Sequence, residues 1–179
     1  MLDAATRVLG QRPEAPVDEI AALAGVSRQT VYAHFPSRQA LLTAVVEQIT
    51  ATVVATIEAA GLERGSAMGA LRRWLDTAWD LIDRYPLLLH PSLATADPRP
   101  SQEQHAPILD QLARLVRRGQ AGGEFDPRLS TGWLLAATVA LGHAAGNEVA
   151  AGRMTSPAAR AAFRDGIIRL YRAEPVVTE

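Results

Sequence analysis

The sequence predicts an all-helical protein, and three observations support this prediction. Apolar residues recur with helical spacing along most of the 179 residues, Gly and Pro residues separate these stretches, and no stretch alternates like a strand. The chain is 48% hydrophobic, which is enough for a sizeable core. We expect a three-helix N-terminal head at 1–46, a helical-bundle body at 47–173 and a tail at 174–179.

The head contains the most informative stretch, residues 17–42. It predicts a helix, a glycine turn, a short second helix, a proline stop and the start of a third helix. Ala21 is small where two helices would cross, Gly25 can adopt a positive φ in the turn, and Val31 would anchor the second helix in the core. This is the spacing of a helix-turn-helix motif, which places one short helix in the major groove of DNA.

The polar residues of the second helix suit the same role. Ser27 is expected to cap this helix through the backbone N–H of Thr30. The first turn of a recognition helix meets base edges, where Arg pairs with guanine and Gln with adenine. Tyr and His near its far end suit phosphate oxygens, and no Asp or Glu occurs between Ile20 and Val46. We therefore predict DNA contacts from Ser27, Arg28, Gln29, Thr30, Tyr32, His34 and Arg38.

These residues also carry a family resemblance. The segments Asp18-Glu-Ile-Ala, Ala24-Gly-Val-Ser, Thr30-Val-Tyr and His34-Phe-Pro-Ser-Arg, at this spacing, resemble the N-terminal signature of the TetR/AcrR family of bacterial transcriptional regulators. The resemblance covers residues 2–48. It implies a homodimer with a DNA-binding head and a larger effector-binding and dimerisation body. It also implies a repressor that a small molecule releases from a palindromic double-stranded operator.

The remaining chain predicts further helices at 37–60, 66–84, 101–118, 130–151 and 156–172, with a short helical stretch from Leu87. Ser156 is expected to cap the last helix, with Pro157 at its first position, as Pro16 is in the head. The run 133–145 is apolar nearly all round, and Gly166 would allow close approach of the last helix. These two helices suit a four-helix dimer interface with two helices from each subunit.

The aromatic residues of the body predict an apolar effector cavity. His105 shares a helix face with Leu109 and would supply a polar anchor, whereas His143 would face either this cavity or the dimer interface. The alternative is ordinary core aromatics and scattered, hydrogen-bonded histidines. The predicted effector-binding set is Trp74, Trp79, Tyr85, His105, Leu109, Trp133 and His143.

Several function classes are disfavoured. The chain has no Cys, so it forms no disulfide and has no thiol nucleophile. We find no metal-ligand spacing and no Gly-x-Ser-x-Gly elbow, so we expect neither a cofactor, nor a metal site, nor an enzyme. No signal peptide and no uncharged apolar run of roughly 18 residues is seen, so we expect a cytoplasmic protein without membrane contact.

Two hypotheses remain. The first is a ligand-responsive, homodimeric DNA-binding repressor. The net charge of −1 agrees with it, because a chain that only bound DNA would be basic. The second is a helical small-molecule-binding or adaptor protein whose head does not bind DNA.

Overall fold

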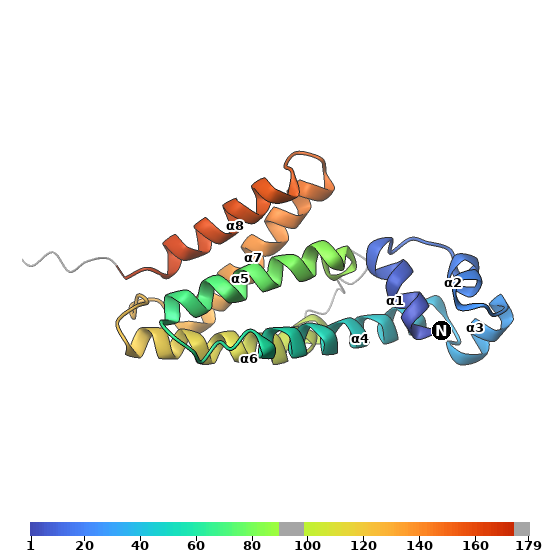
Figure 1. The fold of residues 1–179 in the computed structure, drawn as a ribbon, viewed down its shortest axis with the longest axis horizontal. Coiled ribbons are helices and arrows are strands. Elements are labelled where there is room, and N and C mark those ends of the chain that lie inside the picture. Colours follow the sequence, from blue (N-terminus) through green and yellow to red (C-terminus); the bar gives the residue numbers. More distant parts are fainter. Residues whose placement is uncertain (90–98, 174–179) are drawn as a thin grey trace, which may run out of the picture. The chain divides into compact units, whose positions relative to one another are not determined.

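The computed structural model describes residues 1–89 and 99–173, and every regular element within them is helical (Figure 1). The elements are α1 (Leu2–Gln11), α2 (Val17–Ala24), α3 (Arg28–His34), α4 (Arg38–Ala59), α5 (Ala67–Arg84), η1 (Pro86–Leu89), α6 (Arg99–Ala121), α7 (Thr131–Ala150) and α8 (Ser156–Tyr171). One isolated bridge joins Phe125 and Arg172. The predicted all-α fold class is confirmed.

The chain forms two compact units. Residues 1–54 with 81–105 make up the first, and residues 55–80 with 106–179 make up the second, so α4 and α5 each contribute to both. The predicted domain boundaries at 46 and 173 stay a prediction, and the predicted tail at 174–179 lies outside the described residues.

In the first unit, α1 packs against α2 and η1, and α2 packs against α3. Gly10 of α1 allows the approach of Tyr85, because a Cβ at Gly10 would lie only 3.1 Å from Cδ1 of that ring. The Gln11 side-chain amide donates to the carbonyl of Arg84 at 2.5 Å. The fully buried core residues of this unit are Ala5, Leu9, Ile20, Val31, Leu41, Val45, Ile49 and Leu87.

In the second unit, α7 and α8 lie side by side (Figure 1). The buried Tyr171 hydroxyl hydrogen-bonds Thr138 Oγ1 at 2.8 Å and the Leu134 carbonyl at 3.2 Å, both on α7. Burial raises the pKa of Tyr171 to about 12. The guanidinium of Arg160 joins α8 to α5 through Asp76 at 3.1 Å and Asp80 at 2.7 Å.

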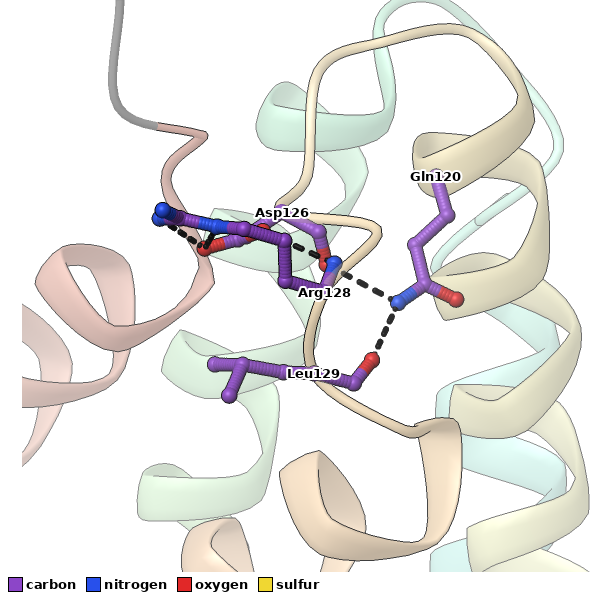
Figure 2. A network of polar contacts seen from close by, with 4 residues as sticks. All are labelled: Gln120, Asp126, Arg128 and Leu129. Carbon is purple, nitrogen blue, oxygen red and sulfur yellow. Dashed lines mark hydrogen bonds and ion pairs between the residues drawn. The ribbon is translucent and has the colours of Figure 1, made fainter.

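The connection between α6 and α7 is closed by polar contacts (Figure 2). The Gln120 side-chain amide donates to the carbonyls of Asp126 at 3.0 Å and Leu129 at 2.7 Å. The Asp126 carboxylate accepts from the backbone N–H and guanidinium of Arg128, and these hydrogen bonds lower the pKa of Asp126. The start of α7 is thereby fixed relative to the end of α6.

Helix caps and bounds follow the sequence in most places, with three corrections. Ser37 accepts from the N–H of Ala40 at 3.0 Å, which caps α4. Thr155, rather than Ser156, caps α8. Pro16 is the extended N-cap residue of α2 rather than its first helical residue, and α6 runs over 99–121 rather than 101–118. Among the described residues, a Cβ at Gly166 would meet nothing nearer than Leu141 Cδ1 at 3.9 Å, and close approach of Gly166 to a second subunit stays a prediction.

Helix α4 is long and apolar enough, with a mean hydropathy of 1.7, to cross a membrane by length and composition alone. Glu47 interrupts the apolar stretch of this helix, so it contains no uncharged apolar run of the length expected of a membrane span. Core helices of soluble proteins meet the same criterion. Here 39% of the apolar stretch of α4 is buried, and the helix buries Leu41, Val45 and Ile49 in the first unit and Ile57 in the second.

Candidate nucleic-acid interface

The turn between α2 and α3 has the geometry that the sequence predicts. Gly25 adopts the left-handed conformation with φ 65°, where a Cβ would be strained. The N–H of Val26 donates to the carbonyl of Ala21 at 3.0 Å. Ala21 and Val31 are buried, so the turn seats α3 firmly on α2.

The start of α3 is capped within three residues. Ser27 Oγ accepts from the N–H of Thr30 at 3.1 Å and lies 2.9 Å from Thr30 Oγ1. This satisfies one of the backbone donors that have no partner inside the helix. The first turn of α3 is therefore held in one conformation, as base recognition requires.

The outer face of α3 offers donors and no carboxylate. Ser27, Arg28, Gln29 and His34 are exposed, while Thr30 and Tyr32 are half-buried. The structure thus places six of the seven predicted DNA-contact residues together, on one helix or at its cap.

Arg28 makes two contacts that sequence reasoning missed. Its Nη1 lies 3.2 Å from Oδ2 of Asp18 on α2, and its Cζ lies 5.5 Å from the centroid of the Tyr32 ring. The sequence spacing of Asp18 and Arg28 does not predict their contact, because that contact depends on how α2 and α3 cross. The second follows from the four-residue separation of two side chains on one helix.

Arg38, the seventh predicted contact, has a structural role. Its Nη1 donates to the carbonyl of Ala15 at 2.8 Å and its Nη2 to that of Pro13 at 2.5 Å. The half-buried guanidinium therefore closes the loop between α1 and α2. A DNA contact by Arg38 stays a prediction.

The structure places the predicted effector residues in different surroundings. Trp74 and Trp79 are buried, and Trp79 packs 5.9 Å from the Phe163 ring and donates to Ser156 Oγ at 3.1 Å. Tyr85 belongs to the first unit and Trp133 is 58% exposed. Leu109 and His143 are half-buried, and the side chain of His105 lies outside the described part. Their role stays a prediction.

One buried donor in this set has no partner in the part of the chain that the structure describes. The indole N–H of Trp74 finds no hydrogen-bond acceptor among the described residues, although the side chain is only 5% exposed. A buried donor without a partner costs free energy, which a ligand oxygen at this place would recover. Trp74 is therefore the predicted effector residue with the most direct structural support.

A separate pocket of about 280 Å³ lies in the second unit. It combines apolar, acidic and basic side chains and contains none of the predicted effector residues. It was not foreseen, because its lining comes from the end of α4, the following loop and α6. The lining residues are Ile57, Glu58, Leu62, Glu63, Gln111, Arg114, Leu115 and Arg118.

Residues 1–45 match the family model described as bacterial regulatory proteins, tetR family. The head of this chain therefore has the TetR-family sequence. This confirms the resemblance predicted from the head, and the family is described as one of regulatory proteins, in line with the expectation that the chain is not an enzyme.

Among relatives, the chain is 41% identical over 81 residues to the HTH-type transcriptional repressor LfrR of Mycolicibacterium smegmatis. That alignment covers 45% of this chain and 43% of the repressor, so it spans less than half of either protein. The crystal structure of LfrR is similar over 97% of this chain and 98% of that one, with 26% identity and a TM-score of 0.62. A transcriptional regulator from Saccharomonospora viridis, solved with choline, shares the fold over 97% of this chain and 96% of its own, with 19% identity and a TM-score of 0.77.

Proposed function

We propose that this TetR-family protein is a homodimeric transcriptional regulator that represses its target by binding a palindromic operator. The observation that carries the proposal is the outer face of α3, where Arg28 and Gln29 stand exposed in a capped first turn without a neighbouring acid on the same helix. Two copies of α3 would read half-sites one helical turn apart, roughly 34–36 Å. Such a target places the protein in the bacterial cytoplasm.

The roles within the head follow from side-chain chemistry. Arg28 and Gln29 would read base edges, because their planar groups pair in bidentate fashion with guanine and adenine. Ser27, Thr30, Tyr32 and His34 would contact phosphates and fix the register of the helix on the duplex. Arg38 would act by holding the loop before α2.

The test is selection of duplexes from a random pool by the wild-type protein, followed by gel shifts with Arg28→Ala and Gln29→Ala. Each variant should lose about 1–3 kcal/mol per half-site and relax the preference at one base position. Unchanged selectivity in both variants would refute the base-reading roles. A wild-type protein that selects no sequence would favour the alternative, a helical small-molecule-binding or adaptor protein.

For the dimer, we propose an interface formed by α7 and α8 of both subunits. Trp133 and Leu141 of α7 are 58% and 39% exposed, which is unusual for large apolar side chains on one helix. Exposed alanines lie between and beyond them on the same helix, at 136, 140 and 144. Small residues among large apolar ones allow two helices to pack closely. This arrangement favours the interface, rather than an effector cavity, as the place of Trp133.

For regulation, we propose that an apolar small molecule binds the second unit and lowers DNA affinity. The buried, unpartnered N–H of Trp74 supports a ligand site there. The bound choline of the Saccharomonospora viridis regulator shows that a neighbour in fold holds a small molecule. Operator and effector would then oppose each other through one coupling free energy, typically about 1–3 kcal/mol. Titration of the selected duplex with candidate effectors tests this, and a duplex affinity that no effector changes would refute it.

A further inference from the structure

Arg28, the residue at the start of α3, is held from two sides. The Asp18 carboxylate on α2 lies 3.2 Å from Nη1, and the Tyr32 ring lies one turn further along α3 with its centroid 5.5 Å from Cζ. Both charged side chains are largely exposed, 59% for Arg28 and 62% for Asp18. An exposed ion pair contributes little to folding stability. We therefore consider its effect on DNA binding.

The two contacts limit the freedom of a flexible side chain. A free arginine samples many rotamers, and holding one of them reduces the entropy lost when it docks. Asp18 uses one of the five N–H donors of the guanidinium, which leaves others for a base edge. The contact with the Tyr32 ring restricts where the guanidinium lies, and a bidentate contact depends on the position and plane of that group.

The charge of Asp18 also favours a contact of Arg28 with a base over a contact with a phosphate. A carboxylate beside the DNA-facing helix repels phosphates, so it lowers affinity for any sequence. It also neutralises Arg28 toward phosphates, which are acceptors that carry no sequence information. A guanidinium restrained in this way is expected to bind guanine in preference to a phosphate, because the two acceptors of guanine match its geometry.

We propose that Asp18 is a positioning residue for base recognition, which with Tyr32 holds the Arg28 guanidinium for a base edge and away from phosphates. The inference rests on the proposed function, since it needs an operator that Arg28 reads. Asp18 itself does not touch the base.

The experiment compares Asp18→Ala with Glu19→Ala. The two acids are neighbours in the first turn of α2, and Glu19 pairs with Arg12 instead of Arg28. Both variants therefore lose one negative charge, one ion pair and the same favourable interaction with the helix dipole. Affinities are measured for the selected operator, for its single-base variants at the position that Arg28→Ala relaxes, and for an unrelated duplex, each at several salt concentrations.

Asp18→Ala should lose discrimination at that one position by roughly fivefold to tenfold per half-site, the lower end of what a bidentate contact contributes. Its affinity for the unrelated duplex should rise, and the salt dependence should steepen by up to about 0.9 per half-site as Arg28 moves to a phosphate. Glu19→Ala should keep full discrimination. Asp18→Glu, which keeps the carboxylate, should restore part of the lost discrimination.

Two results would overturn the inference while leaving the proposed function intact. One is equal discrimination in Asp18→Ala and Glu19→Ala. The other is a loss that persists when Asp18→Ala is added to Arg28→Ala, because a positioning residue has no effect once its partner is gone. Circular dichroism of all variants shows whether α2 has melted, and Asp18→Asn provides a nearly isosteric second variant. A wild-type protein that selects no operator would instead overturn the proposed function and this inference together.

Discussion

Replacing Gly119 of α6 by alanine should destabilise the protein, because the new methyl group would occupy the space of the Phe125 ring. An ideal Cβ at Gly119 would lie 2.2 Å from Cδ2 and 2.5 Å from Cε2 of that ring. Carbon atoms in contact are about 3.5–4.0 Å apart, so the ring would have to move by roughly 1.3 Å or more. Phe125 is fully buried and stands edge-on to the Tyr171 ring at 5.4 Å. Its backbone N–H is bound to the Gly119 carbonyl at 3.1 Å, so it cannot swing away freely.

The magnitude follows from two opposing effects. Overpacking a tight core costs about 1–3 kcal/mol, and the immobile ring places Gly119→Ala at the upper end. Alanine in place of glycine gains at most about 1 kcal/mol in a helix, less near its end. We expect a net loss of about 2 kcal/mol. For a chain of this length, this corresponds to a fall in Tm of about 4–8 °C.

The assay is thermal unfolding followed by circular dichroism at fixed protein concentration, because the Tm of the proposed dimer would depend on concentration. Gly122→Ala is the matched control, since a Cβ there meets nothing nearer than the Arg118 carbonyl at 3.4 Å. Adding Phe125→Leu to Gly119→Ala should cost less than the sum of the single changes, because the smaller side chain makes room. The reasoning is refuted if Gly119→Ala unfolds at or above the wild-type temperature, or if the two changes simply add.

Three further predictions concern the second unit. Gly166→Arg should give a monomer by light scattering with helical circular dichroism largely retained, and operator affinity should drop sharply because one head contacts one half-site; a variant that stays dimeric places the interface elsewhere. The Glu124 carboxylate accepts from the N–H groups of Ala67 and Met68, which lowers its pKa below the usual 4.5. A carboxylate with a lowered folded pKa stabilises the protein above its unfolded pKa and loses this effect as the pH falls. The Tm of Glu124→Gln should thus vary less with pH than the Tm of the wild type below about pH 5. Identical Tm–pH profiles of the two proteins would contradict this role of Glu124 at the start of α5. Trp74→Phe should weaken effector binding by about 0.5–1.5 kcal/mol without changing operator affinity; an unchanged effector titration would exclude the indole N–H from the site.

The features that the sequence alone predicts depend on interactions between residues close together in the chain. Gly25 marks the turn because only glycine adopts that backbone freely, and Ser27 caps α3 through a hydrogen bond that spans three residues. The helices of the body follow from apolar spacing in the same way. The resemblance of the head to the TetR family rests on this local pattern, so the exposed residues of α3 could be named from the sequence.

Contacts between distant segments decided the rest. Arg38 is a residue type that commonly contacts DNA phosphates. Its guanidinium instead donates to backbone carbonyls that lie 23 and 25 residues earlier in the chain, which the local sequence does not reveal. The Asp18–Arg28 pair and the fit of Gly119 under Phe125 depend equally on how elements cross or turns close. Aromatic composition predicted a cavity wall, whereas packing buried Trp79 against Phe163 and left Trp133 exposed. Helical periodicity states which face of a helix is apolar and not what that face meets, so only the tertiary structure separates a core residue from an interface residue or a ligand contact.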